Sequence, residues 1–115
     1  MSDQERLLQV LAAMSNPHRL RLLARLHARP GYVSQLARDL GVSRPLLHMH
    51  LDKLEKAGLI TGHLELSTDG KALKVYQLEA FHFVLNAETI SAAIAASDDQ
   101  PPADSPTGTQ PGAAT

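Results

Sequence analysis

The chain has 115 residues, enough for one compact domain with a modest core but too few for a substrate cleft between two lobes. It contains no cysteine, which excludes disulfides, thiolate metal ligands and a cysteine nucleophile. Hydrophobic residues make up 43% and charged residues 20%, an ordinary balance for a globular protein. No apolar run approaches the ~20 residues of a membrane span, and the acidic start "MSDQERLLQV" does not resemble a signal peptide, so we expect a cytoplasmic protein.

The formal net charge of −1 is unevenly distributed along the chain. All 11 Lys and Arg residues lie within residues 1–96 together with nine of the 12 acids, so this part carries +2 and residues 97–115 carry −3. Residues 97–115 have no large apolar side chain to bury, and we predict a disordered acidic tail rich in Pro and Ala. Residues 1–96 are predicted to form the folded domain, whose attraction to nucleic acid would be local.

Two helices are predicted before residue 30. The first, within residues 4–14, has a broad apolar face with helical spacing, and we expect this face to meet a partner. The second begins with Asn16 as N-cap and Pro17 at the first helical position, and Pro30 with Gly31 ends it. The leucines predicted to point from this second helix toward the core are Leu20, Leu23 and Leu26.

The stretch "VSQLARDLGVS" predicts a helix-turn-helix motif. Ser34 is expected to cap a short helix, Gly41 to form the tight turn, and Ser43 to cap the next helix. That second helix of the motif is predicted over residues 44–57, because Gly58 is a natural residue at a helix C-terminus.

The apolar period then changes from that of a helix to two. "ITGHLEL" and "ALKVYQL" flank "STDGK", where Asp69 and Gly70 supply the turn of a β-hairpin. "FHFVL" also alternates, and Asn86 is expected to cap a last, Ala-rich helix. The predicted fold is therefore mainly α with a small β-hairpin wing, a winged helix-turn-helix.

The sequence also carries a family resemblance. "MSNPHRLRLLARL" resembles the opening of the ArsR-type winged-helix regulators, and "VSQLARDLGVSRPLLHMHLDKLEKAGLI" with "DGKALKVYQL" resembles their reading helix and wing. The likeness covers roughly residues 6–80. It implies a homodimeric repressor of transcription that binds operator DNA with helix 44–57 in the major groove and the wing, residues 63–78, on the adjacent backbone.

The chain departs from that family pattern in two places. Metal-sensing members carry cysteines in the first helix of the motif, where this chain has "SQLARDL", and others use His and acidic residues on the last helix, where it has "AETISAAIAA". We therefore expect no metal and no cofactor. The "FHFVL" segment between the wing and the last helix is the second departure.

The run His48, Met49 and His50 could suggest either a metal site or a reading face. On a helix the three side chains diverge by about 100° per residue, so they cannot meet on one ion. His50 leans inward and is expected to be a packed, hydrogen-bonded histidine. His48 and Asp52 share metal-ligand spacing, but this is also the spacing of an ordinary surface pair. Asp52 would repel phosphate unless it accepts from a cytosine amine or pairs with His48 or Lys56.

The outward face of helix 44–57 suits the reading of base edges. Arg44 can pair with guanine, His48 can donate to a base or a phosphate, and Leu46 or Met49 can touch a thymine methyl group. The competing interpretation is a solvated face. The predicted DNA-contacting residues of this helix and its cap are Ser43, Arg44, Pro45, Leu46, His48, Met49 and Lys53.

Phosphate contacts are expected from other elements, since helix N-termini offer free N–H groups and the wing carries lysines. These side chains could equally be ordinary surface groups. The further candidates are Arg19, Ser34, Gln35, Arg38, Lys71 and Lys74.

The sequence is compatible with three functions. The leading one is a homodimeric, sequence-specific DNA-binding regulator, and the alternative is a winged helix that binds another protein without specific DNA binding. A sensor role would be an addition to the first, through His63 and His82 if their segments pair. An enzyme is not expected, because no phosphate-binding loop or nucleophile motif is present. The predicted dimer-interface residues are Leu7, Leu8, Leu11, Met14, Ile90 and Ile94.

Overall fold

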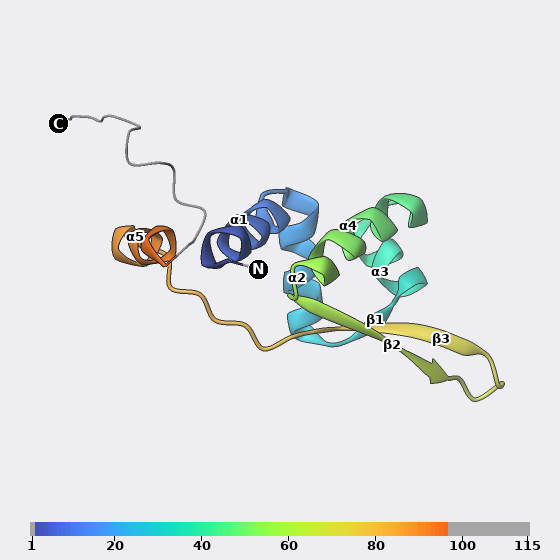
Figure 1. The fold of residues 1–115 in the computed structure, drawn as a ribbon. Helices are drawn as coiled ribbons and strands as arrows, with labels where there is room; N and C mark the ends of the chain where they lie inside the picture. The colour runs from blue at the N-terminus through green and yellow to red at the C-terminus, as the bar shows by residue number, and fades with distance from the viewer. Residues whose placement is uncertain (1, 97–115) are drawn as a thin grey trace. The chain divides into compact units, whose positions relative to one another are not determined.

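The computed structural model describes residues 2–96, and the predicted tail of residues 97–115 lies outside them. Within the described residues the chain forms five α-helices and one three-stranded antiparallel sheet (Figure 1). The elements are α1 Asp3–Met14, α2 Pro17–Ala28, β1 Gly31–Tyr32, α3 Val33–Leu40, α4 Arg44–Lys56, β2 Ile60–Leu66, β3 Ala72–Leu78 and α5 Ala87–Ala95. This is the winged helix-turn-helix fold that the sequence predicts.

The start of α2 follows the prediction, but its inward face does not. The Asn16 side chain accepts hydrogen bonds from the backbone N–H groups of His18 and Arg19, at 2.9 and 3.2 Å. Leu23 and Leu26 are buried as expected, whereas Leu20 is 53% exposed. The prediction for Leu20 is wrong because Leu22, which is fully buried, takes the inward position of this helix.

The helix-turn-helix motif consists of α3, a turn at Gly41, and α4. Gly41 has φ +69°, and a side chain there would meet no neighbouring atom, so only this left-handed backbone requires glycine. The predicted cap of α3 is wrong by two residues: the helix begins at Val33 with Tyr32 as N-cap, and Ser34 lies inside its first turn. Ser43 caps α4 as predicted, and its Oγ accepts from the Leu46 N–H at 3.3 Å.

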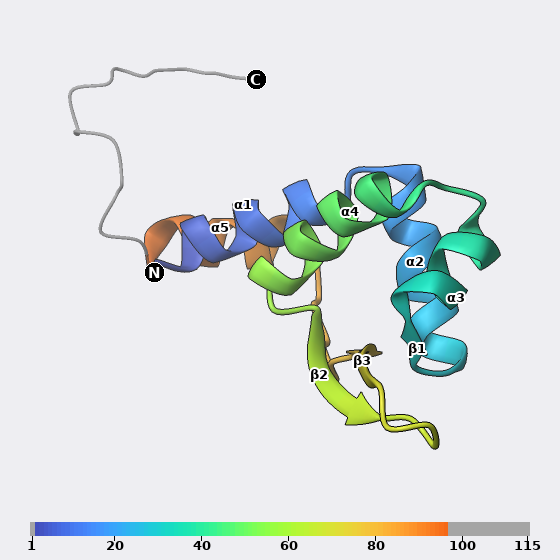
Figure 2. The ribbon, with the colours of Figure 1, turned by 90° about the vertical axis from the view of Figure 1, so that its right-hand side faces the viewer.

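The sheet has the strand order β1-β3-β2. The hairpin pairs Ile60 with Leu78 at one end and Leu66 with Ala72 at the other, and it extends away from the helices (Figure 2). We refer to this β2–β3 hairpin as the wing. Its turn holds Gly70 at φ +84°, as the sequence predicts. The two-residue strand β1 was not predicted.

The "FHFVL" segment, residues 81–85, is not a strand. Its alternating pattern indicated one, but the segment has no strand partner within residues 2–96, and its apolar side chains are exposed. His63 and His82 are therefore not brought together by strand pairing, as the sensor hypothesis required. His63 instead contacts its neighbour Glu65, with Nε2 at 2.7 Å from the carboxylate.

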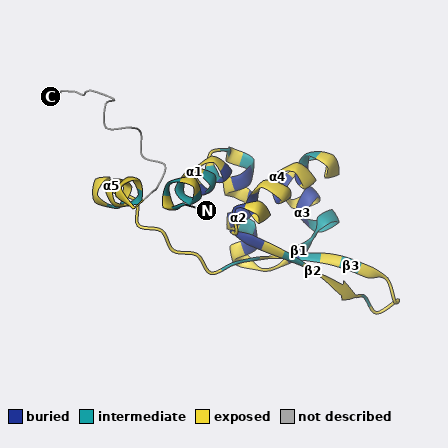
Figure 3. Cartoon of the chain, in the orientation of Figure 1, coloured by how far each residue is buried: buried dark blue, intermediate teal, exposed yellow. Residues whose placement is uncertain are grey.

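The core lies among α2, α3, α4 and the start of the wing, with Val10 and Ala13 of α1 (Figure 3). The largest fully buried side chains of the core are Leu22, Leu36, Leu47, Leu51, Leu54, Leu59 and Ile60. Complete burial of one leucine side chain stabilises the fold by roughly 1.5–3 kcal/mol relative to an exposed one. This core fixes the helix-turn-helix and the base of the wing in one compact unit, Leu8–Phe83.

Helix α5 belongs to the second compact unit of the chain. Asn86 caps it as predicted, since its Oδ1 accepts from the Thr89 N–H at 2.8 Å and Thr89 Oγ1 accepts from the Asn86 N–H at 2.9 Å. None of the residues of α5 is buried, and Ile90 and Ile94 are 43% and 37% exposed. None of the helices in residues 2–96 is long and apolar enough to cross a membrane.

Candidate nucleic-acid interface

The buried face of α4 holds this helix in place. Leu47, Leu51 and Leu54 repeat at the spacing of one helix face and are at most 1% exposed. Gly58, at φ +76°, reverses the chain directly after the helix and leads it into β2. Both ends of α4 are thus fixed by local signals, and the opposite face is left to solvent.

His50 is the polar member of the buried face, as predicted. It is 2% exposed, and its Nδ1 lies 3.2 Å from Nη1 of Arg19. Because a guanidinium only donates, the imidazole accepts through Nδ1 and carries its proton on Nε2. Burial, followed by the positive charge of Arg19 and the neighbouring His18, lowers the pKa of His50 below its usual value. His50 is therefore a neutral group that joins α4 to α2.

Arg19 does not lie where a DNA contact was expected. The residue is 8% exposed, and its Nε donates to the Ala13 carbonyl at 2.7 Å while Nη1 donates to His50. Its burial comes from the fold, since Arg19 occupies the inward face of α2 beside the end of α1. We therefore assign Arg19 a role inside the protein.

The exposed face at the start of α4 presents the side chains predicted to read bases. Arg44, Pro45 and His48 are exposed, Met49 is 49% exposed, and Leu46 is partly buried. A group that is already packed or paired cannot reach into a groove, so this open face meets the first requirement of a reading helix.

Asp52 finds its partner on the same helix. Its carboxylate lies 3.0 Å from Nζ of Lys56, which is the i, i+4 pair, and not beside His48. The ion pair offsets the negative charge that would otherwise repel phosphate. Of the pairings considered from the sequence, the structure shows the one with Lys56.

Lys53 lies on a different edge of α4 from Arg44. Nine residues separate the two, which at 100° per residue places them about 180° apart around the helix. Lys53 lines a cavity with residues of α1 and Arg19 instead. The structure thus separates Lys53 from the other predicted contacts of this helix.

Two arginines of α2, Arg21 and Arg25, hold α3 in place through hydrogen bonds. Arg21 donates from Nη2 to the Leu40 carbonyl at 3.2 Å, at the end of α3. Arg25 donates from Nε to the Asp39 carboxylate at 2.8 Å and from Nη1 to the Arg29 carbonyl at 2.6 Å. The Arg25 guanidinium lowers the pKa of Asp39. These positioning residues were missed, because contacts between helices leave no periodic signal in the sequence.

A hollow of about 220 Å³ lies where the helix-turn-helix meets the wing. It brings together the first turn of α3, the first residue of α4 and strand β3. Polar or cationic side chains from all three elements line it, so it combines a helix N-terminus with two positive charges. Its lining residues are Tyr32, Val33, Ser34, Arg44, Ala72, Leu73 and Lys74.

Lys74 is held at this hollow by the wing itself. Its ammonium lies 5.3 Å from the centre of the Tyr76 ring, a cation–π contact. Gly62 pairs with Tyr76 across the hairpin, and a Cβ there would come within 2.7 Å of Lys74 Cε and 2.8 Å of the ring. Gly62 therefore leaves the space that these two side chains occupy.

The remaining predicted DNA contacts, Arg38, Lys71 and Gln35, differ in how far their side chains are exposed. Arg38 on α3 and Lys71 in the wing turn are exposed. Gln35 was expected to be exposed, but it is partly buried, and its Oε1 accepts from the Tyr32 N–H at 3.2 Å. Its amide oxygen thus helps to cap α3.

Comparisons with known proteins agree with this geometry. Residues 14–63 match a family described as a helix-turn-helix domain. The chain is 37% identical over 78 residues to an HTH-type transcriptional regulator of Methanocaldococcus jannaschii, covering 68% of this chain and 81% of that protein. A crystal structure of an ArsR family transcriptional regulator is 26% identical, with a TM-score of 0.57, covering 78% of this chain and 86% of that one. The chain belongs to the ArsR family of winged helix-turn-helix transcriptional regulators.

The fold of this ArsR-family regulator also matches a solution structure from Mycobacterium bovis. That protein is described as a homodimeric winged helix-turn-helix DNA-binding domain, and it is 22% identical with a TM-score of 0.58 over 64% of each chain. At this identity the match concerns the fold. Regulators of the ArsR family bind operator DNA, often as homodimers, and the family is one of transcription regulators rather than enzymes.

This ArsR-family regulator has no cysteine to serve as a metal ligand. Among residues 2–96, no three His, Asp or Glu side chains are grouped so that they could hold a metal ion. The ring centres of His18 and His50 lie 5.4 Å apart in the core, beside the Arg19 cation. A neighbouring positive charge opposes the binding of a second cation there.

Two further residues of the regulator's wing region were missed in the sequence. Tyr32 pairs with Val75 in the sheet, caps α3 and lines the hollow, and Gly62 makes room for Lys74. A glycine inside a strand pattern signals the close approach of another group, so Gly62 could have been found. Tyr32 carried no such signal.

Proposed function

We propose that this chain forms a homodimer that binds specific double-stranded DNA and represses transcription, with α4 in the major groove and the wing on the adjacent backbone. The observation that carries the proposal is the hollow lined by Ser34, Arg44 and Lys74. It joins a helix N-terminus to two cations directly beside the open face of α4. A backbone phosphate next to an inserted helix suits this arrangement.

Base recognition is assigned to the first two turns of α4. Arg44 can donate two hydrogen bonds to a guanine, His48 can donate to a base acceptor, and Met49 can contact a thymine methyl group. All three are exposed. Arg38 and Lys71 are assigned to phosphates on either side, and Ser43 and Leu46 support the start of the helix.

The dimer is assigned to the terminal helices. Leu8 and Leu11 of α1 are 57% and 38% exposed, and α5 has no buried residue. A second copy would remove these apolar groups from water. A two-fold dimer would present two reading helices to half-sites about one DNA turn, or ~34 Å, apart. Met14 packs partly against the chain's own core, so it contributes less to this surface.

The test is fluorescence anisotropy of the full chain with DNA from its own upstream region and with a shuffled sequence, across a salt series. We expect the first DNA to bind several kcal/mol more tightly and both affinities to fall with salt, because phosphate contacts release counterions. Equal, weak binding to both DNAs would contradict specific recognition of this site. Light scattering after gel filtration should give twice the mass of 12.4 kDa.

The sign of regulation has its own measurement. A dimer lying over a promoter would block the polymerase, so a reporter gene behind the bound DNA should become more active when the protein is deleted. A fall in reporter activity on deletion would make the protein an activator.

A second candidate function is a winged helix that binds another protein. The observation in its favour is that Leu64 and Leu66 of β2 are 71% and 78% exposed, which DNA backbone does not require. Under this alternative, double-stranded DNA would not bind even at low salt, and replacing both leucines by serine would abolish capture of a defined protein partner while leaving the fold intact.

A further inference from the structure

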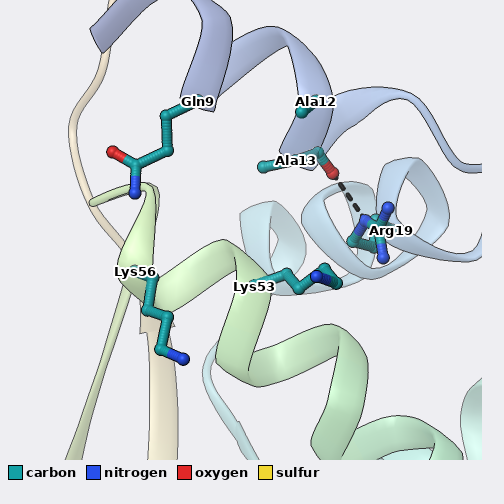
Figure 4. Close-up of a pocket in the computed structure, with 6 residues that line it drawn as sticks. All are labelled: Gln9, Ala12, Ala13, Arg19, Lys53 and Lys56. Atoms are coloured by element: carbon teal, nitrogen blue, oxygen red, sulfur yellow. Dashed lines mark hydrogen bonds between the residues drawn. The ribbon is translucent and has the colours of Figure 1, made fainter. Parts of the chain in front are cut away.

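A second cavity lies on the other edge of α4, away from Arg44. Its volume is about 310 Å³, near the lower end of the range for small-molecule sites. The end of α1 and the second half of α4 form its two sides, and Arg19 of α2 closes one end below Ala13 (Figure 4). The lining residues are Gln9, Ala12, Ala13, Arg19, Lys53 and Lys56.

The cavity carries an excess of positive charge. Three cations line it, and only Lys56 has a carboxylate partner within residues 2–96, Asp52 at 3.0 Å. Lys53 makes no ion pair with any described residue. Cations that converge on a concave surface raise the local concentration of anions.

Arg19 is the unusual member of this group, because it is a buried cation without a carboxylate. It is 8% exposed, and the two described hydrogen bonds of its guanidinium go to neutral acceptors, the Ala13 carbonyl and His50 Nδ1. Burying a charge is costly unless an opposite charge or strong hydrogen bonds offset the lost hydration. An anion in the adjoining cavity would supply that missing negative charge.

Gln9 adds a polar atom without a described hydrogen-bond partner to the same cavity. Its Oε1 is buried and has no hydrogen-bond partner among the described residues. Buried amides normally find a partner, and rotation of the terminal amide by 180° would present two N–H donors there. Ala12 and Ala13 contribute a small apolar wall. Donors and cations around a small apolar wall suit a small organic anion.

We propose that this cavity binds a small anion with a carboxylate or phosphate group, held by Arg19, Lys53 and Gln9, and that the bound anion weakens the affinity for DNA. The second part rests on the proposed function. Lys53 and Lys56 lie on the helix assigned to the major groove, so an anion beside them lowers the positive potential that attracts DNA.

Binding is tested first without DNA. The full chain is titrated by calorimetry with inorganic phosphate and, separately, with succinate, at an ionic strength held constant with chloride. We expect saturable binding of at least one of them, with Lys53→Gln about tenfold weaker, because it removes a charge-assisted hydrogen bond. The matched control is Arg29→Gln, which removes an exposed cation outside the cavity. Binding of neither anion, or equal losses in the two variants, would overturn the site.

The two anions also distinguish the sources of the ligand. Tighter binding of phosphate supports a phosphorylated compound, and tighter binding of succinate supports a carboxylate metabolite. Amide chemical shifts should change at Gln9, Ala12 and Ala13 and stay constant in the wing. Shifts that change in the wing instead would place the anion at the DNA-contacting hollow and contradict the proposal.

The regulatory part is then tested by anisotropy with the specific DNA. The better anion should weaken DNA binding of the wild-type and Arg29→Gln proteins and have less effect on Lys53→Gln. Lys53→Gln alone should weaken DNA binding slightly, because it also lowers the positive potential of this helix. An anion that weakens DNA binding equally in the wild-type and Lys53→Gln proteins would overturn the regulatory part. Absence of specific DNA binding in every sample would overturn the proposed function, whereas saturable calorimetric binding would still support the site.

Discussion

The two faces of α4 differ in what they contribute to the molecule. The buried face, with Leu47, Leu51 and Leu54, is almost completely removed from solvent, whereas Arg44 and His48 on the other face are exposed. The first face contributes most of the helix's free energy of folding, and the second contributes little. The exposed face can therefore vary in sequence at little cost in stability, while the packing of the buried face fixes its position.

The largest expected effect tests the buried face. Leu51→Ala should lower the free energy of unfolding by roughly 2–5 kcal/mol, because it removes buried methyl groups and leaves a cavity. Met49→Ala, on the exposed side of the same turn, is the matched control and should change it by less than about 0.5 kcal/mol. Urea unfolding followed by circular dichroism measures both, and similar losses in the two variants would contradict the division of the helix into two faces.

The reverse pattern is expected for DNA binding. Arg44→Ala should weaken binding to the specific DNA by about 1–3 kcal/mol and reduce the preference over a shuffled sequence, with little change in the free energy of unfolding. Arg29→Ala, which removes an exposed arginine at the far end of α2, should leave the preference unchanged. An Arg44→Ala protein that still discriminates between the two DNAs would remove Arg44 from the reading set.

A smaller effect is expected at the start of α4. Ser43→Ala removes the Oγ that accepts from the Leu46 N–H and should destabilise the protein by about 1 kcal/mol. Ser34→Ala should cost less, because Ser34 lies inside the first turn of α3 and is not its cap. The melting temperatures of the two variants measure this difference. A larger fall in melting temperature for Ser34→Ala would contradict the observed cap positions.

The smallest expected effect concerns pH. The pKa of His50 is lowered in the folded protein, so below about pH 6.5 the unfolded chain takes up a proton that the folded protein resists. Stability is then greatest above pH 6.5 and declines as the pH falls toward the folded pKa. The melting temperature should fall between pH 7.5 and pH 5, and it should fall less in His50→Gln. Asp39 and Asp69, whose pKa values are also lowered, act only at lower pH.

Much of the helix-turn-helix could be predicted because its signals are local. Caps at Asn16, Ser43 and Asn86 and the turns at Gly41 and Gly70 each act on a few neighbouring residues, and all are where the sequence indicates. Helix α4 was predicted over residues 44–57 and spans Arg44–Lys56. Element order and the wing followed from those signals together with the change of apolar period.

What could not be predicted depends on distant contacts. Arg19 is buried because its guanidinium donates to two acceptors, the Ala13 carbonyl at the end of α1 and Nδ1 of His50 in α4. The apolar period of the sequence does not indicate that these groups lie beside Arg19. The strand β1 has only two residues, too few for a period, and it forms because β3 offers an open edge. Conversely, "FHFVL" has the period of a strand but no partner among the described strands. For the site residues, the sequence indicated which could contact DNA, and the structure separates Lys53 and Gln35 from the others.

Tyr32 gives the wing a mechanical connection to the motif. It belongs at once to the sheet, opposite Val75, and to the first turn of α3, where its N–H is bound by Gln35. A force applied to the wing therefore reaches the beginning of the helix-turn-helix through one residue, without a flexible linker between them. The wing and the start of the motif are therefore expected to move together. Hydrogen exchange at the Tyr32 amide should become slower whenever the tip of the wing is held in place.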